Sequence, residues 1–164
     1  SITKSSPALS QENTVKKPAT RKVGVIISND FHGKEVASVL ETLKAEGMQP
    51  ELISAKLGMV KGSDGVELEV DHTFLTCDSV LFDALYVVGG KDVDKKFDRE
   101  TTYFVEEAYD HFKPIGATHD GKQWLEKLEI SNAPGVVLGD DTDQFVTGFV
   151  DAVSAHRHWD REEI

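Results

Sequence analysis

The stretch KVGVIIS at residues 22–28 decides the fold. A short run of β-branched apolar residues is typical of a parallel strand that is covered on both faces. Asn29, Asp30 and Gly33 follow it with turn and helix-capping chemistry. The next apolar residues recur at helical spacing, at Val36, Val39, Leu40 and Leu43. Gly47 then closes this segment as a left-handed cap, so the pattern predicts a strand followed at once by a helix.

The same alternation continues along the chain. Further strands are predicted at 50–55 (PELISA), 84–88 (ALYVV), 114–118 (PIGAT) and 135–138 (GVVL). The third strand of the chain ends in Gly89 and Gly90, where the backbone can turn tightly beneath a ligand or another strand. The segment VKGSDGVELEVD at 60–71 interrupts the alternation, because Gly-Ser-Asp-Gly between two extended pieces predicts a hairpin.

Three more helices complete the predicted pattern. One covers 98–112, with a face formed by Phe104, Val105, Ala108 and Phe112. A short helix containing Trp124, Leu125 and Leu128 follows the turn at 119–121, and a last helix, capped near Asp141, carries Phe145, Phe149, Val150 and Val153. Strands that alternate with helices form parallel sheets through right-handed crossovers. The predicted fold is therefore α/β: a doubly wound, flavodoxin-like parallel sheet with helices on both faces and a β-hairpin excursion.

Length and charge restrict the possible functions. The 164 residues fit one domain at 21–164, preceded by a linker at 1–20 that is rich in Ser, Thr, Lys and Pro and has no hydrophobic period. The net charge is −11, and it divides into +4 over residues 1–22 and −15 over the rest. Such an acidic body disfavours binding to nucleic acids or anionic membranes. The sequence shows no apolar run of about 18 residues and no signal-peptide core near residue 1, so it leaves the localisation unknown.

Ligands of doubly wound sheets bind outside the carboxyl ends of the strands, so four turns are candidate sites. These turns cover 28–33, 89–92, 118–121 and 139–143. The first of them, SNDFHG, lacks a glycine-rich or hydroxyl-rich phosphate loop, and Asp30 would repel an anion. We therefore expect no FMN or dinucleotide cofactor.

The turn after PIGAT has the layout of a nucleophile elbow with His119 at its apex. An elbow presents Ser or Cys, and neither is placed here for an imidazole base to activate. The favoured interpretation is a turn pair, with His119 and Asp120 bonding to the backbone. Glu35 is sufficiently explained by the dipole of the first helix, and the single cysteine, Cys77, by packing as a small hydrophobe.

The segment at 156–161, HRHWDR, offers two histidines that could bind metal. Histidines two residues apart on a helix point about 200° apart, whereas zinc needs three or four converging ligands. Basic residues at the end of a helix, with Trp159 packing back on the body, are the favoured account. We therefore expect no metal site.

Several of these segments together resemble one family. RKVGVIISND, ALYVVGG, KPIGATHDGKQWL, GVVLGD and AHRHWDRE make residues from about 21 onward similar to the C-terminal domain of large-subunit, haem-containing catalases. The tail segment SPALS resembles the connector from a catalase core. The resemblance implies a relationship to the class I glutamine amidotransferase and intracellular protease superfamily, whose elbow holds Cys in contact with a Glu. His119 matches the elbow position and Glu35 matches the Glu, so the elbow is expected to be vestigial.

The resemblance implies a function as well as a fold. Haem and the decomposition of hydrogen peroxide belong to the parent catalase, and we expect neither a cofactor nor catalytic residues in this fragment. The expected role is structural, through contacts with the catalase core and neighbouring subunits of the tetramer, together with ATP-independent, chaperone-like binding of unfolded clients. The alternative is residual hydrolase or deglycase activity that uses His119, Glu35 or Cys77, with Asp120 nearby.

Overall fold

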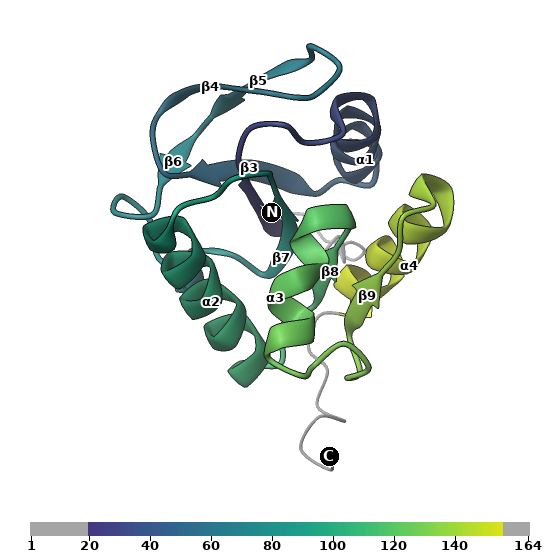
Figure 1. The fold of residues 1–164 in the computed structure, drawn as a ribbon. Helices are drawn as coiled ribbons and strands as arrows, with labels where there is room; N and C mark the ends of the chain where they lie inside the picture. Colours follow the sequence, from purple (N-terminus) through teal and green to yellow (C-terminus); the bar gives the residue numbers. More distant parts are fainter. Residues whose placement is uncertain (1–19, 156–164) are drawn as a thin grey trace, which may run out of the picture.

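Six parallel strands in the order β6-β3-β2-β7-β8-β9 form the central sheet of this computed structural model, which describes residues 20–155 (Figure 1). The segment at 156–161 and nearly all of the expected linker lie outside the described residues. The strands are β2 (Lys22–Ile27), β3 (Gln49–Ser54), β6 (His72–Thr73), β7 (Ala84–Gly89), β8 (Ile115–Ala117) and β9 (Val136–Leu138). All of the predicted sheet strands are confirmed. Only the two-residue edge strand β6 was not predicted, because its pairing with β3 rather than a sequence pattern defines it.

Helices cover both faces of the sheet, which confirms the doubly wound fold. The helices are α1 (Gly33–Ala45), α2 (Lys95–Asp110), α3 (Lys122–Lys127) and α4 (Thr142–Ala155), with 3-10 turns η2 (Ser79–Leu81) and η3 (His119–Gly121). In Figure 1, α1 and α4 lie on one side of the sheet, and α2 and α3 on the other. None of the helices within residues 20–155 is long and apolar enough to cross a membrane.

The alternation of side chains along β7 builds two separate cores. Tyr86 and Val88 face the core beneath α1 and α4, whereas Leu85 and Val87 face the core beneath α2 and α3. Successive residues of a strand point to opposite faces of the sheet, so a fully buried central strand must be apolar throughout. All six residues of β7 are buried, as the sequence pattern predicted.

Helix α2 begins and ends earlier than its apolar pattern indicated. Asp94 caps it by accepting a hydrogen bond of 2.8 Å from the backbone N–H of Phe97, so the helix starts at Lys95 rather than at 98. Phe112 was predicted to belong to its apolar face, but the helix ends at Asp110. Phe112 instead adopts a left-handed backbone conformation with a φ of 62°, and this conformation terminates the helix.

The predicted hairpin is confirmed as β4 (Gly58–Lys61) paired with β5 (Glu67–Val70), separate from the main sheet. Its turn packs on the start of α1, where Asp64 accepts a hydrogen bond of 3.0 Å from the backbone N–H of Lys34. A Cβ at Gly33 would lie only 2.1 Å from the Asp64 carboxylate, so the close approach requires glycine. Asp64 thus caps the helix, and the side chain of His32 at the N-cap position makes no capping bond.

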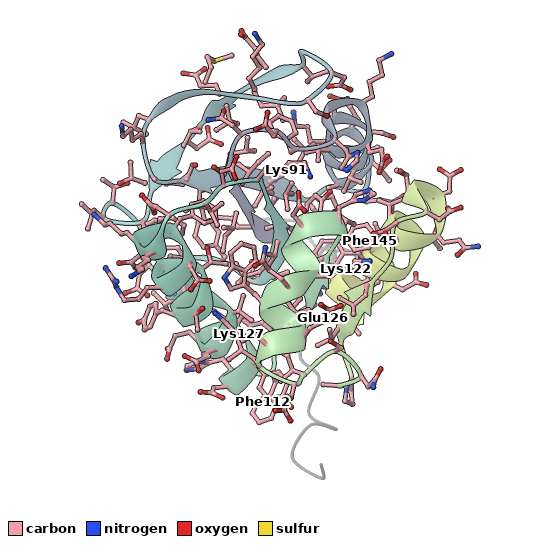
Figure 2. All side chains as sticks on the ribbon, in the orientation of Figure 1. Lys91, Phe112, Lys122, Glu126, Lys127 and Phe145 are labelled. Carbon is pink, nitrogen blue, oxygen red and sulfur yellow. The ribbon has the colours of Figure 1, made fainter. Side chains whose placement is uncertain are left out.

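The short helix α3 is held to both of its neighbours. The indole N–H of Trp124 donates to Asp98 of α2 at 2.8 Å, and the Lys127 ammonium lies 3.2 Å from the same carboxylate. On the opposite side, the Lys122 ammonium donates to Asp140, in the turn that follows β9, at 3.0 Å. Figure 2 shows Lys127 on the side of α2 and Lys122 on the side of α4. These contacts fix the turn that precedes α3.

Candidate functional site

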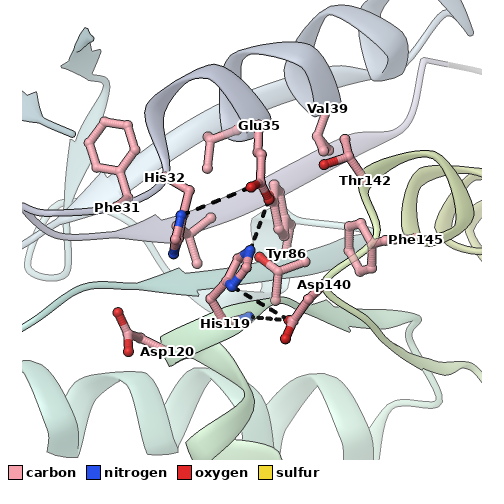
Figure 3. A pocket seen from close by; sticks show the side chains of 13 residues that line it. Phe31, His32, Glu35, Val39, Tyr86, His119, Asp120, Asp140, Thr142 and Phe145 are labelled. Atoms are coloured by element: carbon pink, nitrogen blue, oxygen red, sulfur yellow. Dashed lines mark hydrogen bonds and ion pairs between the residues drawn. The ribbon is translucent and has the colours of Figure 1, made fainter. Parts of the chain in front are cut away.

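All four candidate turns meet at the carboxyl edge of the sheet, and three of them supply the residues of the site. His32 follows β2, His119 follows β8 and Asp140 follows β9, while Glu35 lies in the first turn of α1 (Figure 3). The Nε2 atom of His119 lies 2.8 Å from a carboxylate oxygen of Glu35, so these residues form a hydrogen bond although 84 positions separate them. Strand ends of a parallel sheet converge in this way because every strand points in the same direction.

The backbone of the elbow holds His119 in an uncommon conformation. Its φ is 47°, in the left-handed region that few residues other than glycine adopt. The following turn lies against β7 so closely that a Cβ at Gly121 would stand 1.9 Å from the carbonyl oxygen of Val87. The backbone N–H of His119 donates a hydrogen bond of 3.0 Å to Asp140. Packing beneath the turn and a carboxylate beside it therefore orient the imidazole.

Asp140 is the carboxylate that supports the elbow. The backbone N–H of His119, and after it the ammonium of Lys122, hold the pKa of Asp140 below its ordinary value. A carboxylate oxygen of Asp140 also lies 3.7 Å from Nδ1 of His119, while Nε2 faces Glu35. His119 is thus placed between two carboxylates, one beside each ring nitrogen.

His32 completes the group from the other side. Its imidazole stacks on that of His119 with ring centroids 3.8 Å apart and an angle of 27° between the planes. Its Nδ1 atom lies 4.0 Å from the second carboxylate oxygen of Glu35. The donor atoms of His32, Glu35 and His119 all lie within 4.8 Å of one another, so two imidazoles and one carboxylate form a compact set of possible metal ligands.

The expected turn pair of His119 and Asp120 is not formed as predicted. The Asp120 carboxylate turns away from the imidazoles (Figure 3) and lies 3.6 Å from the Lys91 ammonium. The carboxylate that binds the backbone of the turn is Asp140 instead. The sequence did not indicate this partner, because Asp140 lies 21 residues farther along the chain and reaches the turn only through the pairing of β8 with β9.

The hollow above this cluster is small and largely apolar. Its lining consists of Phe31, His32, Glu35, Val36, Val39, Tyr86, Val88, Thr118, His119, Asp120, Asp140, Thr142 and Phe145. It has room for about one water-sized particle. Tyr86 forms part of its floor, and burial raises the pKa of that phenol. Neither Ser nor Cys belongs to the lining, so the described residues place no hydroxymethyl or thiol nucleophile beside His119.

Cys77 lies away from this hollow and packs against the core beneath α2 and α3. It is half-buried, and its thiol donates a hydrogen bond of 3.3 Å to the carbonyl oxygen of Thr73. Burial, followed by the negative charges of Asp78 and Glu51, raises the pKa of the Cys77 thiol to about 11. A thiol with such a pKa is almost entirely protonated at neutral pH and is a poor nucleophile.

Sequence reasoning singled out Glu35, His119, Asp120 and Cys77. The structure places the first three around one hollow, with a hydrogen bond between Glu35 and His119, and places Cys77 elsewhere. Sequence reasoning missed His32 and Asp140. Both residues lie in turns that the doubly wound pattern predicted as candidate sites, so the positions of these turns could have identified His32 and Asp140.

Comparisons with known proteins agree with this architecture. Residues 19–163 match the family described as the C-terminal domain found in long catalases. The chain is 61% identical over 161 residues to a catalase of Alkalihalophilus pseudofirmus. The matched segment covers 98% of this chain and 24% of that catalase. It is 45% identical to Catalase-2 of Bacillus subtilis over 95% of this chain and 23% of that protein.

A solved structure supports the fold independently. A ThiJ/PfpI domain protein from Brachyspira murdochii has a TM-score of 0.70 to this chain at 16% identity, over 83% of this chain and 98% of that one. This likeness shows a shared flavodoxin-like fold. The chain spans about a quarter of the length of the two catalases, so their activity resides in proteins that are much longer than this chain.

Proposed function

The chain belongs to the family of C-terminal domains found in long catalases, and from this premise we propose that it is a non-catalytic domain of a longer, peroxide-decomposing subunit. Haem would reside in the remainder of that subunit. The hollow at the carboxyl edge of the sheet does not fit haem, because it has room for about one water-sized particle, whereas cofactor pockets usually hold about 300 Å³ or more. The domain would act by packing on the catalase core and on neighbouring subunits.

The observation that carries this proposal is the elbow itself. The apex holds an imidazole that is hydrogen-bonded to Glu35, where an acyl-transfer enzyme of this layout needs a nucleophile. The one cysteine of the chain lies elsewhere, and its raised pKa opposes activation. The small hollow also offers no enclosed pocket for an ester or amide substrate. These features argue against the alternative hydrolase or deglycase function.

A separate surface supports the proposed packing on the catalase core. Leu75, Val80, Leu81 and Tyr103 are exposed large apolar residues near the β6 edge and on α2, and we call them the apolar edge. Leu75 and Val80 are more than three-quarters exposed, and Val80 and Tyr103 line the same surface hollow. We assign the apolar edge to the rest of the catalase subunit, because relatives of this family carry about three times as much additional chain.

The same surface would give the separate domain a chaperone-like activity. Exposed apolar side chains can hold unfolded segments, and the net charge of −11 would keep the loaded complexes from coalescing. No phosphate loop is present, so this binding would not depend on ATP.

Light scattering of a heat-denatured client, such as alcohol dehydrogenase, tests the binding activity. Wild-type domain should reduce scattering more than serum albumin at equal mass, and the double variant Leu75→Ser/Val80→Ser should lose most of that effect. Met59→Ser is the matched control, because Met59 is an exposed apolar residue on the separate hairpin. Equal scattering with domain and albumin would reject the chaperone-like role and leave a structural one.

The catalytic alternative has its own test. Purified domain should show no haem absorption, release no oxygen from peroxide, and turn over no ester, amide or glyoxal adduct. Turnover of any of these organic substrates that is present in wild type and lost in His119→Ala would contradict the non-catalytic proposal. Oxygen release with a haem spectrum would contradict the assignment of haem to another part of the subunit.

A further inference from the structure

We propose that His32, Glu35 and His119 form a binding site for one divalent transition-metal ion of the zinc class. The proposal stands independently of the function proposed above. The expectation that the chain holds no metal rested on the histidines at 156 and 158, and this site uses neither of them.

The spacing of the donor atoms fits a single ion. Zinc binds imidazole nitrogen and carboxylate oxygen at about 2.0–2.2 Å, so tetrahedral ligand atoms lie about 3.3 Å apart. In the structure, His119 Nε2 lies 2.8 Å and His32 Nδ1 lies 4.0 Å from the oxygens of Glu35. These two separations bracket the required value, and the donor atoms of all three residues lie within 4.8 Å of one another. Binding would therefore require the three side chains to close in on one ion and His32 to leave its stack on His119.

His32, the N-cap residue of α1, and Glu35, in its first turn, can make these movements. They lie three positions apart at the start of the helix, and their side chains approach to 4.0 Å. Their side chains are 45% and 41% exposed, so they can rotate without disturbing the core. The imidazole of His32 would turn from its stack on His119 until its lone pair faces the ion.

His119 is fixed in the manner of a metal ligand. Ligating histidines usually present their second ring nitrogen to a carboxylate or carbonyl group, which sets the tautomer and the ring orientation. Here Nδ1 of His119 faces Asp140, and the ion pair with Lys122 holds that carboxylate in place. Nε2 of His119 points toward Glu35 of α1.

Charge and space favour a metal ion over other ligands. Asp120 and Asp140 are each paired with a lysine, so Glu35 provides the carboxylate charge for a cation. Two imidazoles and one carboxylate suit zinc or cobalt, whereas magnesium and calcium prefer oxygen ligands throughout. The hollow has room for about one water-sized particle, which suits a small ion.

The test is metal binding by the whole chain, measured by equilibrium dialysis with zinc and by the visible spectrum of bound cobalt. Wild-type protein should bind one ion per chain at micromolar zinc. His32→Asn and Glu35→Gln should each weaken binding about tenfold or more and remove the spectrum of tetrahedral cobalt. Because both side chains are substantially exposed, these variants should fold normally, which circular dichroism would verify.

Two controls separate this site from other histidines of the chain. The double variant His156→Asn/His158→Asn should bind as wild type. So should His72→Asn, whose imidazole lies beside Glu51 and belongs to the outermost strand, β6. The proposal is overturned if wild type binds no ion at micromolar zinc. It is equally overturned if binding survives in His32→Asn and Glu35→Gln or disappears in either control.

Discussion

Substituting Gly121 by alanine should destabilise the fold strongly, although the backbone angles at this residue suit alanine. Its φ of −67° and ψ of −21° lie in the right-handed helical region, so a Cβ causes no conformational strain there. The added atom would instead stand 1.9 Å from the carbonyl oxygen of Val87 and 2.6 Å from its carbonyl carbon. Both are backbone atoms of β7, the central strand that separates the two cores.

The expected loss of stability in Gly121→Ala follows from this contact. The 1.9 Å separation is more than 1 Å shorter than real Cβ atoms tolerate, so either the elbow or β7 must move. Overpacking of a well-packed interior costs about 1–3 kcal/mol, and we expect the upper end because no flexible side chain can absorb the shift. For a chain of this size, about 3 kcal/mol lowers the melting temperature by about 6–12 °C.

Gly139→Ala is the matched control, since Gly139 lies in the neighbouring turn after β9. A Cβ there would meet only the Phe145 Cβ at 3.8 Å, which is an ordinary contact. Both substitutions reduce the conformational entropy of the unfolded chain to a similar extent, worth about 0.4–1 kcal/mol in the free energy of unfolding. The difference in stability between the two variants therefore reports the contact with Val87. The assay is thermal unfolding followed by circular dichroism. Melting temperatures within about 2 °C of each other would refute the reasoning.

Three further outcomes can be measured on the same protein. The rate of Cys77 alkylation by iodoacetamide should be low at pH 8, in contrast to that of glutathione, and should rise as the pH approaches about 11. Rapid labelling at neutral pH would disprove the raised pKa. Burial raises the pKa of Glu51, but hydrogen bonds from His72 and Gln49 outweigh the burial and lower the pKa overall. The ionised Glu51 therefore stabilises the fold above the ordinary pKa of 4.5, and this stabilisation is lost as the pH falls through the pKa of the folded state. The urea midpoint of Glu51→Gln should therefore fall less than that of wild type between pH 7 and pH 3.5, and an equal fall would contradict the shift. In urea unfolding, Trp124→Phe should lower the free energy of unfolding by about 1.5 kcal/mol or more, because it removes a buried donor to the Asp98 carboxylate. Lys127→Met removes an exposed ion pair with the same carboxylate and should lower the free energy of unfolding by less than about 1 kcal/mol.

The sequence by itself determined the order and type of nearly all the elements of the sheet. KVGVIIS and ALYVV are apolar without interruption because strands in the middle of a doubly wound sheet are buried on both faces. Their patterns depend only on neighbours along the chain, and they therefore predicted the class of fold and the separate hairpin. The start of α2 was missed by three residues, because its first turn is held by the Asp94 cap rather than by an apolar residue of the predicted stripe.

Only the tertiary structure decided which of the candidate residues meet. Glu35 and His119 lie 84 positions apart, and their contact depends on β2 and β8 lying on either side of β7 and ending at the same edge of the sheet. The cap of α1 comes from Asp64 of the hairpin, while the His32 side chain makes no capping bond and stacks on His119. Asp140, rather than the adjacent Asp120, supports the elbow because β9 pairs with β8. Such contacts arise from the packing of distant segments, and no local period in the sequence records them.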